Sequence, residues 1–208
     1  GSEMCIRDSL ASFWQAIAKE FSTFKNIYGY GLMNEPHDLA PETKWFDMAQ
    51  ASINAIREVD TNTLIMVGGN DWSSAERWIE QSDTLKFLKD PANNLAFEAH
   101  VYFDKDASGT YKYSYEEEEC YPEKGIDRVK PFVEWIKQNK FHGFIGEYGI
   151  PDNDPRWNET LDLFLGYLQE NGINGTYWAA GPWWDTYFMA ITPKDGKDRP
   201  QMLSLIHI

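Results

Sequence analysis

The chain has 208 residues, of which 42% are hydrophobic and 15% are aromatic, so its composition is that of a globular protein. This length suits one ordinary domain or two small ones, and it allows a substantial core. The 19 Lys and Arg residues are outnumbered by 33 Asp and Glu residues, which gives a formal net charge of −14. Such a charge repels nucleic acids and anionic membrane surfaces, so neither is an expected partner.

No part of the sequence indicates a metal, a redox centre or a membrane span. The two cysteines, Cys5 and Cys120, lack the C-x-x-C spacing of zinc and redox sites. Asp104 and Asp106 have acidic neighbours but not the spacing of a calcium loop. No run of eighteen apolar residues occurs, and the opening octapeptide lacks the features of a signal peptide. We therefore expect no metal and no cofactor.

The first half of the chain alternates between helical and strand patterns. Ser9 can cap a helix, because the apolar residues after it recur at helical spacing as far as Phe21. Pro41 opens a second helix. The expected elements are a helix at 9–24, a strand at 26–34, a helix at 41–58, a strand at 63–68, a loop at 69–73 and a short helix from Ser74.

The second half continues the alternation around one long polar segment at 103–124. That segment exceeds the usual length of a loop, which indicates either a function or mobility. Gly172 closes the last of the helices. The expected elements are a strand at 95–102, a helix at 126–139, a strand at 143–147, a helix at 157–171 and a strand at 175–179.

Strict alternation of this kind predicts an α/β fold with parallel strands and right-handed crossovers. Polar or aromatic residues follow each expected strand, at the edge of the sheet where α/β proteins bind ligands. Five strand signals are too few for a whole eight-stranded barrel, which takes about 250 residues. Residues 1–9 and 203–208 do not fit the pattern, and we expect them to be non-native or disordered ends.

Two of the expected strands end in a glutamate. Glu35 follows the first strand in YGYGLMNEPHD, and Glu147 follows the fourth in FHGFIGEYGIP. In a (β/α) barrel such positions face the active site, and a pair of carboxylates delivered there is the equipment of a glycosidase. Either glutamate alone could cap the next helix or pair with a lysine. The two together favour catalysis.

These motifs resemble glycoside hydrolase family 5, the cellulase family. The family carries Asn-Glu-Pro after its fourth strand, here Asn34 to Pro36, and His-x-Tyr at its sixth, here His100 and Tyr102. It carries Glu after its seventh strand and Trp after its eighth, here Glu147 and Trp178. The resemblance covers residues 10–200 and looks closest to the endoglucanase subfamily 5. It implies a TIM (β/α)8 barrel that is incomplete, with about the last five β/α units.

The resemblance also implies roles for these residues. Glu35 would be the acid/base and Glu147 the nucleophile of a retaining mechanism. Asn34 would bind the sugar 2-hydroxyl, His100 would adjoin the acid/base, and Tyr102 would hydrogen-bond the nucleophile. His100 and Tyr102 are two residues apart on one strand, so they share a face.

The tryptophans are candidate sugar platforms, because aromatic rings stack on the apolar faces of sugars. By the resemblance Trp178 lies beneath the reacting sugar. Trp183 and Trp184 follow it and could line a more distant subsite, although packing in the core or a loop explains them equally well. Trp72, on the loop after the second strand, is a weaker candidate.

The family further uses an Arg from its second strand and a His from its third, and neither has a counterpart here, since the chain is expected to begin in the helix after strand three. The expected activity is an endo-β-1,4-glucanase acting on a β-glucan polysaccharide. A β-mannanase or xyloglucanase on the same scaffold, or an inactive carbohydrate-binding fragment, remains an alternative. We expect a secreted protein, and self-association through the exposed edges of the partial sheet.

Overall fold

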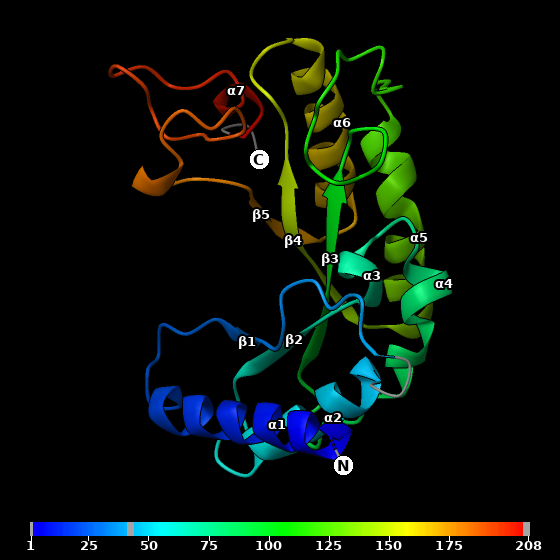
Figure 1. Ribbon diagram of the computed structural model, residues 1–208, viewed down its shortest axis with the longest axis vertical. Helices are drawn as coiled ribbons and strands as arrows, with labels where there is room; N and C mark the ends of the chain where they lie inside the picture. The colour runs from blue at the N-terminus through cyan, green and yellow to red at the C-terminus, as the bar shows by residue number, and fades with distance from the viewer. Residues whose placement is uncertain (1, 41–43, 206–208) are drawn as a thin grey trace.

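A single curled sheet of five parallel strands forms the centre of the molecule (Figure 1). The computed structural model describes residues 2–40 and 44–205. Neighbouring strands in the sheet follow one another in the chain, as in a (β/α) barrel, and together they make an incomplete one. The strands are β1 (Gly29–Gly31), β2 (Leu64–Gly68), β3 (Leu95–Tyr102), β4 (His142–Gly149) and β5 (Asn174–Tyr177).

Helices cover the outer face of the sheet (Figure 1). Within the described part of the chain, none of them is both long and apolar enough to span a membrane. The helices are α1 (Ser2–Phe21), α2 (Trp45–Arg57), α3 (Asn70–Ser73), α4 (Trp78–Ser82), α5 (Lys124–Asn139), α6 (Arg156–Glu170) and α7 (Met202–Leu205), with 3-10 turns η1 (Asp83–Phe87) and η2 (Pro182–Trp184).

The two faces of β3 show how the sheet separates its core from its site. Phe97 faces the helices, where its ring meets Trp135 edge-on at 4.9 Å and Trp78 at 6.4 Å. Side chains alternate along a strand, so His100 and Tyr102 project from the opposite, concave face. Burial of the aromatic face stabilises the fold, and the concave face is left free for polar groups.

Most predicted elements are confirmed, but several boundaries were wrong. The loop predicted at 69–73 contains the short helix α3, and the ends predicted to be non-native or disordered are helical at 2–9, in α1, and at 203–205, in α7. Helix α1 begins at Ser2, so Ser9 lies inside it and does not cap it. Strand β1 is only three residues long, because just Gly29–Gly31 pair with β2 and the chain turns at Glu35, whose φ is 48°. Helix α4 begins at Trp78, because Ser74 instead forms a bridge with His100. Residues 41–43 of the second predicted helix, and 206–208, lie outside the described residues.

The long polar segment after β3 is organised by buried carboxylates. Asp104, which is fully buried, accepts hydrogen bonds from the backbone of Gly109, Thr110 and Tyr111. Glu118 likewise accepts from the backbone of Lys105 at 2.8 Å. These carboxylates satisfy backbone donors that a loop would otherwise leave unpaired, so the segment forms a defined wall beside the site.

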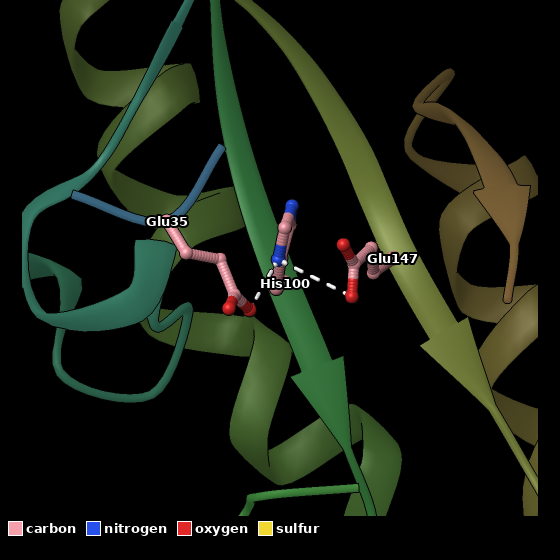
Figure 2. A group of neighbouring side chains, drawn as sticks. All are labelled: Glu35, His100 and Glu147. Atoms are coloured by element: carbon pink, nitrogen blue, oxygen red, sulfur yellow. Dashed lines mark hydrogen bonds and ion pairs between the residues drawn. The ribbon is translucent and has the colours of Figure 1, made fainter. Parts of the chain in front are cut away.

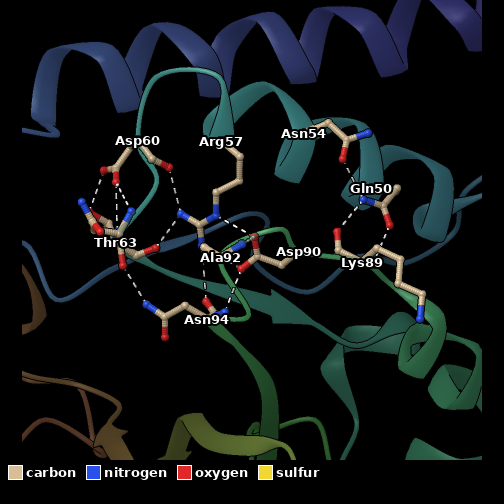
Figure 3. A network of polar contacts seen from close by, with 10 residues as sticks. Gln50, Asn54, Arg57, Asp60, Thr63, Lys89, Asp90, Ala92 and Asn94 are labelled. Carbon is tan, nitrogen blue, oxygen red and sulfur yellow. Dashed lines mark hydrogen bonds and ion pairs between the residues drawn. The ribbon is translucent and has the colours of Figure 1, made fainter.

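A buried ion pair joins the N-terminal ends of β2 and β3 (Figure 3). Arg57, at the end of α2, donates to both carboxylate oxygens of Asp90, at 2.7 and 2.9 Å. It also donates to the carbonyl oxygens of Asp60 and Thr63. The two charged side chains are only 4% and 1% exposed, so each depends on the other for its charge to be compensated.

Replacing Arg57 with Met should therefore destabilise the fold by about 3–5 kcal/mol, because it leaves the charge of Asp90 buried and unpaired. The double variant Arg57→Met/Asp90→Asn should lose less than the sum of the two single variants. Urea unfolding measures both. Lys86→Met, which removes the more exposed pair with Asp83, is the matched control and should cost about 0–1 kcal/mol. Equal losses for Arg57→Met and the control would contradict this.

Both edges of the sheet are open within the described residues, since β1 pairs only with β2 and β5 only with β4. Apolar side chains flank the β1 edge, where Tyr28 is 66% exposed and Phe24 is 51% exposed. Open edges and exposed apolar residues together favour pairing with another chain.

We expect the 208-residue chain to self-associate through these edges, so light scattering should detect species larger than a monomer that grow with concentration. Tyr28→Lys should reduce the association, because it adds a charge beside β1 without disturbing the core. A soluble monomer at all concentrations, with a sharp thermal transition, would contradict this expectation.

Candidate active site

The end of β1 delivers the first glutamate to the concave face. The backbone N–H of Leu32 donates to the carbonyl of Met66 at 3.0 Å and continues the pairing with β2 just beyond the strand. Glu35 then has a φ of 48°, in the left-handed region that non-glycine residues rarely adopt. His37 Nδ1–H donates to the carbonyl oxygen of Glu35 at 2.6 Å. This turn directs the Glu35 carboxylate toward β3 (Figure 2).

A β-bulge in β4 delivers the second glutamate. Ala99 pairs with Ile145, but the next residue, His100, pairs with Glu147, so Gly146 is an extra residue in β4. Regular alternation would send Glu147 to the same face as Ile145, which is fully buried in the helix-facing core. Beyond the bulge, the side chains of β4 point to the face opposite to the one that regular alternation would give. Glu147 therefore projects from the concave face.

The two glutamates meet on either side of His100 (Figure 2). His100 Nδ1 lies 2.8 Å from Glu35 Oε1 and 3.7 Å from Glu147 Oε2. One carboxylate oxygen of each glutamate and the His100 nitrogen lie within 4.8 Å of one another. The side chain of His100 is 3% exposed, and those of Glu35 and Glu147 are 25% and 14% exposed. The carboxylates are thus partly shielded but open to a ligand.

The charge of His100 follows from its neighbours. Burial by itself lowers the pKa of His100, because it disfavours the charged ring. Hydrogen bonds to Glu35 and Glu98, with the nearby charge of Glu147, outweigh burial and raise the pKa of His100 to about 9. The ring is therefore an imidazolium at neutral pH, which offsets the repulsion between the carboxylates around it.

Tyr102 lies on the same strand as His100 and hydrogen-bonds the second glutamate. Its hydroxyl donates to Glu147 Oε2 at 2.7 Å. Burial and the charge of Glu147 raise the pKa of Tyr102 far above its usual value, so the hydroxyl keeps its proton and remains a donor.

Trp72 lies between two cavities. It stacks on His37, with ring centroids 4.5 Å apart and planes 14° apart, and 42% of its surface is exposed. A cavity of about 390 Å³ on one side is lined by Glu35, His100 and Tyr102 as well as Trp72. A second cavity of about 630 Å³ shares Trp72 and reaches the exposed ring of Phe87. An aromatic surface thus leads away from Glu35.

The other predicted residues lie around the two glutamates and His100, and their side chains differ in exposure. Trp178 follows β5, is half-buried, and meets Trp184 edge-on at 4.8 Å. Trp183 is 90% exposed, so it points to solvent. Asn34 is exposed beside Glu35, and its side chain hydrogen-bonds to no other described residue. Trp178 and Trp184 therefore form one aromatic cluster, which Trp183 does not join.

Two further residues belong to the site. Glu98 Oε1 lies 3.3 Å from His100 Nε2, and the ring of Tyr187 lies 5.0 Å from that of Trp184, near the charge of Glu147. The sequence did contain a signal for Glu98, because it stands two residues before His100 and therefore on the same face of β3. Tyr187 lies in an irregular segment after η2, where no periodic pattern in the sequence predicts the direction of a side chain.

Within the part of the chain that the structure describes, Glu35, His100 and Glu147 are the group of potential metal ligands that comes together. A histidine must be neutral to bind a metal, whereas its neighbours hold His100 in the protonated form. The arrangement therefore suits proton transfer and hydrogen bonding between acids better than it suits a cation.

Comparison with known proteins identifies the family of the chain. The model of the cellulase family, glycosyl hydrolase family 5, matches residues 2–183. The chain belongs to glycosyl hydrolase family 5. Among its relatives, endo-beta-1,4-glucanase B of Emericella nidulans is 36% identical over 200 residues, which cover 94% of this chain and 58% of that protein. The chain thus spans less than two thirds of the length of this family 5 relative.

Solved family 5 structures share the fold. An endoglucanase of Pseudomonas stutzeri in complex with cellobiose is 43% identical, with a TM-score of 0.89 over 96% of this chain and 59% of that one. An endo-beta-1,4-glucanase of Xanthomonas axonopodis pv. citri is 34% identical, with a TM-score of 0.86 over 96% of this chain and 64% of that one. The five-stranded sheet is therefore an incomplete TIM barrel of the family 5 type.

The raised pKa of His100 predicts how stability varies with pH. The pKa is about 9 in the folded chain and near 6.5 when unfolded, so the stabilisation is complete below about pH 6.5 and lost as pH rises through about 9. Urea unfolding across this range should show that loss in the parent chain and not in His100→Asn. His37→Asn, at an exposed histidine, should keep the loss. Identical pH dependence in all three would contradict the prediction.

Proposed function

We propose that the protein hydrolyses β-1,4-linked glucans with retention of configuration, through a double displacement. The observation that carries the proposal is the approach of Glu35 and Glu147, whose nearest carboxylate oxygens lie within 4.8 Å of each other. Retaining glycosidases keep their two carboxyl groups about 5–5.5 Å apart, whereas inverting ones need about 6.5–9.5 Å to admit a water. The short separation leaves no room for that water.

In the first step Glu35 gives its proton to the glycosidic oxygen as the bond to the anomeric carbon breaks, and Glu147 attacks that carbon. The product is a glycosyl ester on Glu147 and a released sugar hydroxyl. In the second step Glu35, now a carboxylate, removes a proton from water, which displaces Glu147. His100 supports Glu35 with its Nδ1–H, and Tyr102 orients the Glu147 carboxylate by donating its hydroxyl to Oε2.

The remaining predicted residues fit substrate binding. We assign Asn34 to the sugar 2-hydroxyl, because its side chain is exposed beside Glu35. Trp178 and Trp184 would stack on the sugar that becomes bonded to Glu147. Trp72 would stack on the leaving-group sugar, which receives the proton of Glu35. Trp183 is the weakest of these assignments, because its ring is 90% exposed and packs against none of the described aromatic rings.

The choice of a β-1,4-glucan as the substrate rests on the relatives. The Emericella nidulans protein is named an endo-beta-1,4-glucanase, and the Pseudomonas stutzeri endoglucanase was solved with cellobiose. A β-mannanase or xyloglucanase would use the same carboxylate pair, since a fold and its catalytic groups do not fix the sugar. Reducing-sugar release from carboxymethylcellulose, mannan and xyloglucan separates the three. Binding of cello-oligosaccharides without release from any polymer would instead indicate an inactive carbohydrate-binding chain.

We also propose that the whole protein acts outside the cell, because a glucan polymer cannot cross a membrane to reach it. Sequencing the gene upstream of residue 1 tests this. A secretory leader is the expected result, and a mature start without one would contradict it.

Substitution of the two glutamates should separate their roles. Glu147→Gln should reduce hydrolysis to background on every substrate, because no other carboxylate can form the ester. Glu35→Gln should slow polymer hydrolysis by about 10²–10⁴-fold but spare aryl glycosides, whose leaving groups need little protonation.

The measurement is the rate on carboxymethylcellulose and on an aryl cellobioside for each variant, in a chain that carries the complete barrel. Glu20→Gln, at an exposed site on α1, is the control and should match the parent. Equal losses on both substrates for both glutamate variants would contradict the assignment.

A further inference from the structure

Glu98 is a carboxylate on the concave face for which the steps above give no role. It lies in β3 two residues before His100, and its side chain is 16% exposed. Its Oε1 atom is 3.3 Å from His100 Nε2, on the side of the ring opposite to the one that meets Glu35. His100 is thus held between Glu98 and Glu35.

The sheet provides space for this carboxylate at one glycine. A Cβ atom on Gly146 would lie 2.0 Å from Glu98 Oε1, whereas one on Gly31 would lie 3.8 Å from Oε2, an ordinary contact distance. Gly146 does not have a positive φ, so glycine is needed there for space and not for backbone conformation. The bulge residue that turns Glu147 inward therefore also makes room for Glu98.

We propose that Glu98 is a positioning residue of this site, which accepts a hydrogen bond from His100 Nε2 and thereby fixes the ring so that Nδ1–H points at Glu35. The proposal rests on the glycosidase function for its catalytic consequence, because Glu35 is the acid that His100 supports. The position of the ring itself does not depend on that function.

The chemistry of imidazole gives the reason. Neutral imidazole has one N–H and one acceptor nitrogen, so it can donate to only one of two flanking carboxylates. When Glu98 and Glu35 are both ionised, only the imidazolium can donate a hydrogen bond to each of them. Without Glu98, the imidazolium would lose a proton at lower pH, and no acceptor at Nε2 would fix the orientation of the neutral ring that results.

Several charged groups act on His100 and must be separated from Glu98. Glu35 approaches from the turn after β1 and Glu147 from β4. Three further charged residues line the same cavity: Asp71, Arg77 and Asp106. Asp106 accepts from the backbone of Ser108 at 3.2 Å, so its removal tests for a general electrostatic effect.

The first experiment is an NMR titration of the His100 ring in the 208-residue chain, with His100→Asn to assign the signal. Glu98→Gln and Glu98→Ala should each lower the midpoint by about one pH unit or more, because each removes an opposite charge in contact with the ring. Asp106→Asn should shift it far less. An unchanged midpoint in both Glu98 variants, or an equal shift in Asp106→Asn, would overturn the proposal.

Gly146→Ala gives an independent test. Its Cβ would occupy the place of Glu98 Oε1, so the variant should expel the carboxylate and lower the midpoint much as Glu98→Ala does. In the Glu98→Ala background the same methyl group has room, so it should add little further change. Additive shifts would show that Gly146 and Glu98 act separately and would overturn this part of the proposal.

Kinetics on a chain with the complete barrel then test the catalytic consequence. Glu98→Gln should lower kcat more than it raises KM, and should move the alkaline limb of the pH–rate profile downward with the His100 midpoint. A shifted midpoint with an unmoved limb would overturn the positioning role. If the parent enzyme hydrolyses no β-glucan, the proposed function fails, and the titration still decides whether Glu98 holds His100.

Discussion

Three carboxylates converge on the single imidazolium of His100, and the arrangement of the site depends on that charge. Glu35 and Glu147 are close enough that, whenever both are ionised, their negative charges repel each other strongly in a partly shielded cavity. The cation between them offsets this repulsion, and its hydrogen bonds fix where the carboxylates point. Burying His100 would by itself remove its charge, and the carboxylates around the ring keep it charged.

The backbone reaches this arrangement by departing from regular geometry in two places. Glu35 has a positive φ, and β4 carries an extra residue at Gly146. Both departures cost conformational free energy, and both lie where a side chain must be turned toward the concave face. The regular parts of the sheet carry the aromatic core, and the network around Arg57 stabilises the opposite end, away from the site (Figure 3).

The regular parts were also the predictable ones. The run LAFEAHVY predicted β3 with its observed ends, because a short and mostly apolar run between turns is typical of a buried strand. The start of α1 was missed, since Met4 and Ile6 are exposed and add nothing to the apolar stripe. The motifs drew attention to Glu35 and Glu147, but they gave Glu98 no role. Its partner Gly146 is distant in sequence, and only the folded sheet brings the two together.

The nucleophile can be identified directly by mass spectrometry. A 2-deoxy-2-fluoro cellobioside with a good leaving group slows the second displacement, because fluorine destabilises the positive charge that develops on the sugar. Incubated with a chain that carries the complete barrel, it should leave one fluorocellobiosyl group on the peptide that contains Glu147. A label on the peptide that contains Glu35, or turnover of natural substrate with no labelled peptide, would contradict a double displacement through Glu147.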